Sequence, residues 1–525
     1  MVNLAKHSQN VIDYRIAAGS KAANVASYVM IGKILTFFMT GVALVAVTRL
    51  LGSHEYGIYT LAMAFGGIFG PIGYFGIGTA LNKFISEYKQ ANKRKEINEV
   101  VSNALFIVVV TGLFLGAMCI VFSGSISNYV FNTSSYSGII RLVALYIITV
   151  ILFGAFYDTL LGFGNGKSIA IVAGIEALFQ ASVSIALAFF GLGAAAPIIG
   201  MAVGYTAGFL CGLALAVHDG HVKLVRPSVK FMKKLLSFSM PVALSNIGGN
   251  LSSNIALIVV GYFVIPSVIG SIGIATRVGS LMSVIFDSIS FALLPAFAAV
   301  LVNRSLKRNV GQIYSYAVYL AIALVGPLLF YMALLSGPFV SLLFGNSYTQ
   351  APFYISIMII GMLIGVAGTY ASTLLLSAGR TDLVLKYNVA VNFVVLIFVI
   401  ALVPFIGSLA YVISTFILSP ILMDLLFIRK LGTLFRINMR IGKVLRLVLV
   451  DILITAIAGV LYLSMSGPML LVVAAALFLM LYPVAAVKAR GIERQDLNTI
   501  ALLSKDIPIF GKILQFMLKY AMMVA

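Results

Sequence analysis

Charged side chains are scarce in this sequence. Of its 525 residues only 10% are Asp, Glu, Lys or Arg, whereas about 25% is usual in a soluble globular domain. Hydrophobic residues make up 61% of the chain, and the mean hydropathy is +1.10. These values exclude a soluble fold. The apolar runs are continuous rather than alternating, so they indicate α-helical membrane spans and not an outer-membrane barrel.

Cysteines and catalytic motifs are also scarce. The two cysteines, Cys119 and Cys211, both fall in apolar runs, so we expect neither a disulfide framework nor a CxxC metal site. The four histidines lie outside the span centres, and no HExxH, GxSxG or P-loop motif is present. The connections between spans are too short to fold as a catalytic domain. We therefore expect no enzyme activity and no bound cofactor.

The apolar runs predict fourteen membrane spans. They begin near residues 23, 55, 98, 138, 168, 193, 235, 267, 313, 350, 386, 409, 443 and 468. An even number puts both termini on one side, and 31 of the 35 Lys and Arg residues fall in segments on that side. Because positive residues are retained in the cytoplasm, we predict a multi-pass protein of the cytoplasmic membrane with both termini inside. The net charge of +20 follows from this topology and favours anionic lipid, not nucleic acid, as a partner.

The chain also resembles itself. GIYTLAMAFG, which begins at Gly57, matches GSIGIATRVG, which begins at Gly270, an offset of 213 residues. A second match pairs LLGFGNGK at Leu160 with LLSAGRTD at Leu375, at an offset of 215. Six spans per repeat is an even number, so both halves cross the membrane in the same sense. Two similar bundles that face each other create a central cavity, which is typical of a transporter.

The predicted fold is therefore an all-α polytopic membrane protein with about 14 transmembrane helices. Two six-helix bundles form a parallel repeat, and two helices are added to them. The predicted domains are 1–222 (N-terminal bundle), 223–432 (C-terminal bundle), 433–488 (additional spans 13 and 14) and 489–525 (cytoplasmic interfacial tail).

Residues 49–88, RLLGSHEYGIYTLAMAFGGIFGPIGYFGIGTALNKFISEY, contain a motif of known type. The segment resembles the polysaccharide-transporter branch of the superfamily that includes multidrug and toxin extrusion proteins and the lipid II flippase. The matching residues are Arg49, Leu50, Leu51, Gly52, Glu55, Tyr56, Gly57, Tyr59, Leu61, Ala62, Gly76, Gly78, Thr79 and Ala80. The resemblance implies a flippase that moves a polyprenyl-linked oligosaccharide across the cytoplasmic membrane by alternating access, with its polyprenyl tail along spans 13 and 14.

Three other functions stay open. The first is a cation-coupled multidrug antiporter of the same superfamily, although a cationic cavity suits cationic drugs poorly. The second is a membrane glycan polymerase or ligase, which would be an enzyme and usually has a large external loop. The third is an assembly scaffold without transport. For the flippase, the expected partners are a lipid-linked glycan, membrane lipids and glycan-assembly enzymes, and we expect a monomer.

Ionisable residues inside the spans are the candidate site residues, because a charge at a helix centre costs ~2.5–3.5 kcal/mol on insertion scales. A lipid-linked glycan carries phosphate, so Lys33, Arg49 and Arg277 are the predicted phosphate-binding residues. The alternatives are snorkelling for Lys33, an ion pair with Asp287 or a neighbouring carboxylate for Arg277, and a structural cap for Arg49. Glu176 and Asp287 either carry protons that couple a gradient to transport or neutralise nearby cations.

Three asparagines form a candidate cation site. Asn250 lies in span 7, and Asn388 and Asn392 lie four residues apart in span 11. The lipid II flippase binds sodium in the corresponding bundle, and this resemblance implies Na⁺ or H⁺ as the coupling ion. These two spans contain no carboxylate, however, and hydrogen bonds between helices explain the asparagines equally well.

Overall fold

The computed structural model describes residues 2–218, 223–302, 309–435, 437, 439–464, 481–494 and 496–498. Side chains are described within these ranges except at residues 2–27, 241–242, 244–250 and 461–464. Every regular element of this part of the chain is a helix, so the predicted all-α polytopic fold is confirmed. Ten of its helices are long and apolar enough to cross a membrane, with the stretch Tyr28–Gln90 counted once.

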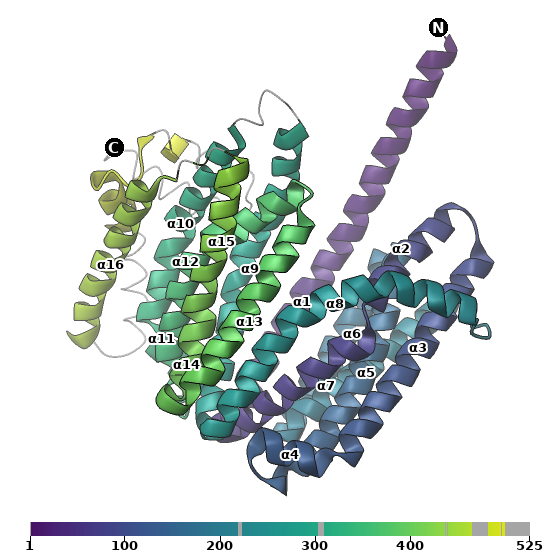
Figure 1. Cartoon of the computed structure of the whole chain (residues 1–525), viewed down its shortest axis with the longest axis horizontal. Helices are drawn as coiled ribbons and strands as arrows, with labels where there is room; N and C mark the ends of the chain where they lie inside the picture. Colours follow the sequence, from purple (N-terminus) through teal and green to yellow (C-terminus); the bar gives the residue numbers. More distant parts are fainter. Residues whose placement is uncertain are drawn as a thin grey trace. The chain divides into compact units, whose positions relative to one another are not determined.

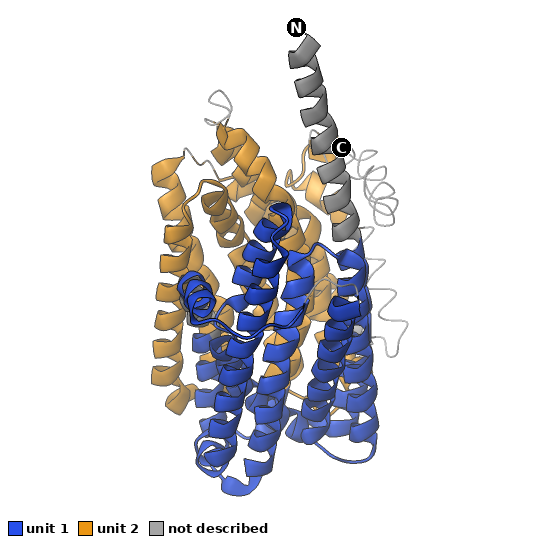
Figure 2. Ribbon diagram, turned by 90° about the vertical axis from the view of Figure 1, so that its right-hand side faces the viewer, with its two compact units in different colours: residues 1–270 blue, residues 271–525 orange. Residues whose placement is uncertain are grey.

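Contacts divide the chain into two compact units, residues 1–270 and 271–525 (Figure 2). Unit 1 contains α1 (Val2–Tyr74), α2 (Ile77–Gln90), α3 (Arg94–Val121), α4 (Ser123–Phe131), α5 (Ser137–Gly162), α6 (Gly166–Phe189), α7 (Ala195–His218), α8 (Val229–Phe263) and the first turn of α9 (Pro266–Val302) (Figure 1). Helix α8 belongs to unit 1 because it packs against α1 to α4.

The first two predicted spans form one continuous element with a kink. Gly52, at φ 71° and ψ 176°, breaks the helical geometry inside α1. A second break follows α1, where Phe75 and Gly76 adopt φ values of 51° and 65°. Glycine tolerates this left-handed region and phenylalanine does so at a cost, so the segment between α1 and α2 is held in place by its surroundings.

Glycines let the helices of unit 1 approach closely. Along α7, Gly200, Gly204 and Gly208 recur every fourth residue; the first two face α6, and Gly208 lies against Phe153 of α5 and Glu176 of α6. A Cβ atom at Gly204 would lie 2.7 Å from the backbone oxygen of Glu176. Such small residues at fourfold spacing are how membrane helices bring their backbones together.

A reciprocal backbone contact joins α1 to the first turn of α9. A Cβ atom on Gly57 would overlap the backbone oxygen of Pro266 and lie 3.1 Å from the nitrogen of Gly270. In return, a Cβ atom on Gly270 would overlap the backbone oxygen of Ser53 and lie 3.2 Å from the nitrogen of Gly57. Both pairs, Ser53 with Pro266 and Gly57 with Gly270, keep the offset of 213 residues that the repeat has in the sequence. The contact is therefore self-complementary, because each segment presents its glycine to the corresponding part of the other.

Unit 2 contains the rest of α9 and the helices that follow. These are α10 (Val310–Leu334), α11 (Ser336–Phe344), α12 (Ala351–Ser377), α13 (Thr381–Ile406), α14 (Ser408–Ile413), the π-helical turn η3 (Ser414–Leu418), α15 (Ser419–Leu434) and α16 (Ile441–Ser464). Helix α12 packs between α10 and α15, and α16 packs against α10 (Figure 1).

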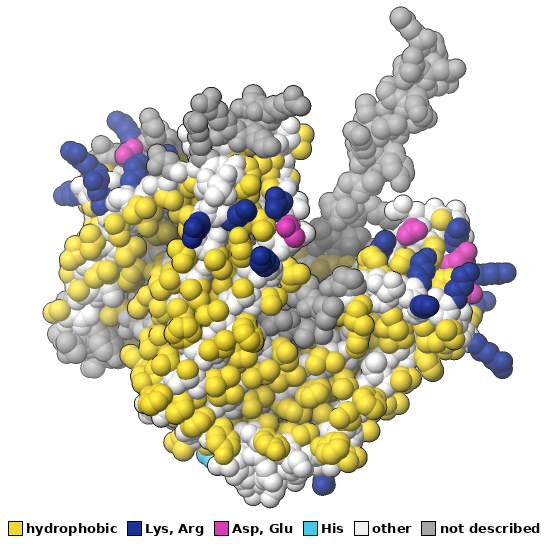
Figure 3. Space-filling view, in the orientation of Figure 1, with side chains coloured by type: hydrophobic (Ala, Val, Ile, Leu, Met, Phe, Trp, Pro, Cys, Tyr) yellow, Lys and Arg dark blue, Asp and Glu magenta, His cyan; other side chains and the backbone are white. Residues whose placement is uncertain are grey.

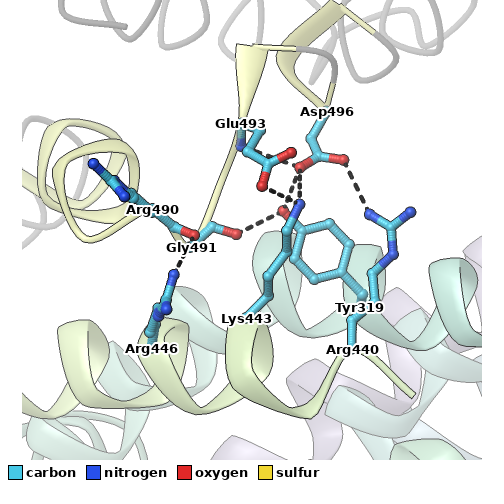
Figure 4. A network of polar contacts seen from close by, with 8 residues as sticks. All are labelled: Tyr319, Arg440, Lys443, Arg446, Arg490, Gly491, Glu493 and Asp496. Carbon is cyan, nitrogen blue, oxygen red and sulfur yellow. Dashed lines mark hydrogen bonds and ion pairs between the residues drawn. The ribbon is translucent and has the colours of Figure 1, made fainter. Parts of the chain in front are cut away.

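A polar network fastens the segment 481–498 to α10 and α16 (Figure 4). The Asp496 carboxylate accepts hydrogen bonds from the Tyr319 hydroxyl, the Lys443 ammonium and the Glu493 backbone N–H. Arg440 lies 3.7 Å from the other Asp496 oxygen. Burial alone would raise the pKa of Asp496, but these hydrogen bonds and the Lys443 charge outweigh it and lower the pKa below its ordinary value.

Each predicted span that begins between residues 23 and 443 coincides with a helical segment. The span predicted near residue 468 lies outside the described residues, as does most of the predicted tail 489–525. Along the sequence, the division between the two compact units falls at residue 270, one helix after the boundary that we predicted at residue 222. The boundaries at 222, 432 and 488 divide the chain by membrane spans and stay predictions.

Candidate functional site

Unit 2 contains a cavity of about 360 Å³ between α9, α12 and the η3–α15 segment. Its size falls in the lower range of ligand-binding pockets. Apolar residues form most of its wall, and its polar side chains are Thr276, Ser280, Ser283, Asp287, Thr369 and Thr415. One carboxylate among five hydroxyls gives an oxygen-rich lining that suits a cation or a hydrogen-bonding headgroup.

Glycines of α12 and the π-helical turn shape one wall of this cavity. A Cβ atom on Gly361 would overlap the backbone oxygen of Phe416, so η3 packs directly on the α12 backbone. About two turns further along α12, the Asp424 carboxylate accepts a hydrogen bond of 2.6 Å from the Gly368 N–H. The buried Thr415 hydroxyl has no hydrogen-bond partner in the described structure. A π-helical turn with an unsatisfied hydroxyl is a common mark of a functional site.

Arg277 and Asp287 both lie on α9, at different depths. Arg277 is exposed between the cavity-lining residues Thr276 and Ser280, and Asp287 lines the cavity itself. Ten residues of helix separate the two by about 15 Å. This distance disfavours a direct ion pair between them, so the cation and the carboxylate act on different parts of the site.

The predicted cations of unit 1 lie on α1. Lys33 is exposed, next to Gly32, whose missing side chain lets α1 approach Ala170 of α6. Arg49 is exposed three residues before the kink at Gly52. Sixteen residues of helix place the two cations about 24 Å apart, so one phosphate group contacts only one of them at a time.

Glu55, from the same sequence motif, has a structural role. Its Oε2 atom accepts a hydrogen bond of 2.8 Å from the Ala194 N–H, at the start of α7. A side chain on Gly193 would collide with this carboxylate, which explains why glycine occupies that position. A carboxylate at a helix N-terminus is favourable, so Glu55 caps α7.

The two predicted proton-coupling carboxylates have different surroundings. Glu176 is buried in α6, and its Cβ faces Gly208 of α7. No cation of the described residues forms an ion pair with it, so charge pairing within unit 1 finds no support. Asp287 instead borders the cavity among hydroxyl groups. The proton-coupling role of both stays a prediction.

Sequence reasoning missed a carboxylate that holds the break between α1 and α2. This residue is Asp158, in α5. In the structure its two oxygens accept hydrogen bonds from the Tyr74 hydroxyl and, at 3.2 Å, from the Asn82 amide. A Cβ atom on Gly78 would overlap this carboxylate, so Gly78 of the GIGTA motif makes room for it. The sequence motif alone does not reveal this contact, because Asp158 lies on another helix, α5, and the sequence does not show that α5 faces Gly78.

The structure describes the side chains of only two of the three asparagines in the predicted cation site. Asn388 and Asn392 donate their amide hydrogens, at 2.8 Å, to the backbone oxygens of Val384 and Asn388 in their own helix, α13. Their amide oxygens are the atoms left for a cation. The Asn250 side chain lies outside the described residues, and the cation site stays a prediction.

Solved structures with a similar fold are membrane transporters. The lipid II flippase MurJ, in an inward closed conformation, is 15% identical with a TM-score of 0.69, over 87% of this chain and 98% of that one. An inward-facing multidrug resistance MATE transporter of the MOP superfamily is 15% identical with a TM-score of 0.62, over 77% of this chain and 98% of that one. The chain therefore has the fold that these two kinds of transporter share.

Sequence comparison identifies the family of this chain more narrowly than the fold does. The model of the polysaccharide biosynthesis protein family matches residues 22–301, more than half of the chain, and the chain belongs to this family. The probable low-salt glycan biosynthesis flippase Agl15 of Haloferax volcanii is 23% identical over 328 residues. That alignment covers 62% of this chain and 66% of the relative, so the chain spans slightly less than two thirds of the relative's length. The resemblance found in residues 49–88 is thereby confirmed.

Proposed function

We propose that this protein flips a polyprenyl-(di)phosphate-linked oligosaccharide from the cytoplasmic to the external leaflet by alternating access. The joint match of family and fold carries the proposal. The chain belongs to a polysaccharide biosynthesis family, has a flippase among its relatives, and shares its fold with the lipid II flippase. The site performs binding and transport and no covalent chemistry.

The proposed orientation has both termini in the cytoplasm. Lys and Arg side chains gather at the α2–α3 end of unit 1 and, in unit 2, around the starts of α13 and α16 (Figure 3). Such ends face the cytoplasm in multi-pass proteins of the cytoplasmic membrane. The substrate is made available on that side, so its headgroup enters from there.

Arg277 is the residue that we propose binds the substrate phosphate in unit 2. Its guanidinium is exposed beside the hydroxyl-lined cavity, and a guanidinium binds phosphate through two parallel hydrogen bonds. The hydroxyls of Thr276 and Ser280 then lie within the same turn for the sugar or the second phosphate. Lys33 on α1 supplies the cation of unit 1, and Arg49 lies nearer the external end.

Asp287 is the proposed site of the coupling ion in unit 2. Its carboxylate borders a cavity lined by five hydroxyls, and its occupation by Na⁺ or H⁺ reduces the negative charge near the substrate phosphate. Loss of this ion on one side of the membrane then weakens phosphate binding and promotes release. Glu176 is the predicted coupling carboxylate of unit 1, where it is buried, whereas Asp287 is exposed.

A multidrug antiporter is the second candidate, because the MATE transporter has the same fold. The two functions differ in the charge of their cargo. Asp287 in the cavity wall attracts a cation, but we assign it to the coupling ion, and the exposed Arg277 beside the cavity then attracts an anionic headgroup and repels a cationic drug. This contrast favours the flippase.

The test is a flipping assay in proteoliposomes with a polyprenyl-diphosphate oligosaccharide, combined with native mass spectrometry of bound lipid. A charge-assisted hydrogen bond contributes about 1.5–3 kcal/mol, so Arg277→Ala should slow flipping roughly 10- to 150-fold. Arg277→Lys should retain part of the rate. The control is Arg380→Ala, an exposed cation paired with Asp382 at 3.4 Å, which should flip normally.

Two outcomes would contradict the proposal. The first is equal flipping rates and equal bound lipid in the wild type and both Arg277 variants. The second is cation-driven uptake of a cationic dye with no bound prenyl lipid, which would establish the antiporter instead.

A further inference from the structure

A carboxylate lies buried and alone in α16. Asp451 has 0% of its surface exposed, and neither of its oxygens has a hydrogen-bond partner in the described part of the chain. It lies ten residues after Ile441, where α16 begins, or about 15 Å along the helix. This is about half the thickness of the hydrocarbon core. In the predicted span 13, Asp451 is therefore an acidic side chain well inside the apolar run.

The helix packed against Asp451 brings no counter-charge. Gly326 of α10 faces it, and a Cβ atom there would lie 3.0 Å from Asp451 Oδ2. Helix α10, residues 310–334, contains no Asp, Glu, Lys or Arg, and neither does the sequence from 452 to 487. An ionised carboxylate in such surroundings loses its hydration without gaining a partner.

The nearest titratable groups are engaged elsewhere. The Tyr482 hydroxyl donates to the Ala323 backbone oxygen at 2.7 Å, and the Tyr319 hydroxyl donates to Gly491 and Asp496. The nearest cations of α16 are Lys443, which binds Glu493 and Asp496, and Arg446, whose guanidinium contacts the Arg490 backbone oxygen at 3.4 Å. Both lie toward the basic end of the helix.

Packing alone does not explain an acid at this position. Asp451 lies among the apolar residues that join α16 to α10, which include Leu447, Val450 and Ile454. Any aliphatic residue would fill this place without an unsatisfied polar atom. Ionisable residues that remain inside membrane helices mark proton or ion pathways.

We propose that Asp451 is a proton-binding site whose occupancy controls the docking of α16 on α10. With the proton bound, the neutral carboxyl is compatible with the apolar α10–α16 contact. When the proton leaves to water, the carboxylate must be hydrated and α16 separates from α10. The site itself does not depend on the proposed flippase function, although its effect on transport does.

The first test is infrared difference spectroscopy of the purified full-length protein, with Asp451→Asn as the reference. The wild type should show the C=O stretch of a protonated carboxylic acid at neutral pH, and this band should disappear as the pH rises. Asp382→Asn, which removes an exposed carboxylate in an ion pair with Arg380, is the control and should leave the band unchanged. A carboxylate band for Asp451 at neutral pH, or an acid band that no pH alters, would overturn the proposal.

The second test measures the docking of α16 by amide hydrogen exchange, corrected for the intrinsic pH dependence of exchange. In the wild type, protection of α16 should fall as the pH rises. In Asp451→Asn it should stay high at every pH, because the amide cannot ionise. The same pH dependence in both proteins would refute the link between protonation and docking.

Flipping is then measured in the same variants. A pH-dependent flipping rate that Asp451→Asn makes pH-independent connects the proton site to transport. If flipping is absent in all variants while the infrared and exchange results hold, the flippase proposal fails and the proton site stands.

Discussion

The crossing of Gly57 and Gly270 allows a sharp test of the packing argument. A methyl group on either glycine collides with a backbone oxygen of the opposite helix, and a backbone cannot rotate away as a side chain can. To restore a normal C···O contact of about 3.3 Å, the two helices must separate by on the order of 1 Å. Overpacking of this kind costs about 1–3 kcal/mol. The better helix propensity of alanine returns up to about 1 kcal/mol.

We therefore expect Gly57→Ala and Gly270→Ala each to destabilise the protein by up to about 2 kcal/mol. The assay is the apparent melting temperature of the purified protein, together with its initial flipping rate in proteoliposomes. Gly41→Ala and Gly70→Ala are the matched controls, because they lie in the same helix α1 and a Cβ atom there meets nothing within 4 Å. Both controls should melt at or above the wild-type temperature.

The reciprocity of the contact gives a further check. Once one methyl group has separated the helices, the second finds room, so the double variant should lose less than the sum of the single losses. The reasoning is refuted if Gly57→Ala melts like Gly41→Ala. It is also refuted if the two losses add fully, since the glycines would then act at independent places.

Two further predictions follow from the other polar contacts. Gly78→Ala should expel the Asp158 carboxylate from its two hydrogen bonds and destabilise unit 1 by about 1–3 kcal/mol. Adding Asp158→Ala to the Gly78→Ala variant should recover part of the loss in melting temperature. If nothing is recovered, the proposed clash between the two side chains is wrong. Because the folded pKa of Asp496 lies below its unfolded value of about 3.9, its stabilising effect is complete above that pH and is lost as the pH falls through the folded pKa. Protease resistance of the segment 481–498 should therefore decline below about pH 4 in the wild type. The Asp496→Asn variant should be sensitive to protease at every pH. If the wild type and the variant show equal pH profiles, Asp496 does not stabilise this segment.

Much of the fold was predictable because hydropathy is a local property of the sequence. A run of about 20 apolar residues spans a membrane whatever it packs against, so each span predicted to begin between residues 23 and 443 coincides with a helical segment, whereas the short helices α4 and α11 were not predicted. The family was predictable as well, since residues 49–88 contain a contiguous motif. The offset between the repeats also predicted which glycines correspond, although it did not predict that they touch.

The site residues depend on which helix faces meet, and an apolar sequence with weak periodicity does not reveal this. Asp158 and Asp451 look alike in the sequence, as single acids within apolar runs. Only the tertiary structure gives Asp158 two hydrogen-bond donors and leaves Asp451 against a glycine, with no donor to its carboxylate among the described residues. Composition and local hydropathy thus determined that this chain is a multi-pass membrane protein and where the long apolar helices of its described part lie, because burial in lipid depends on each segment alone. Helix packing decided which charges are paired, because a partner must come from a distant part of the chain.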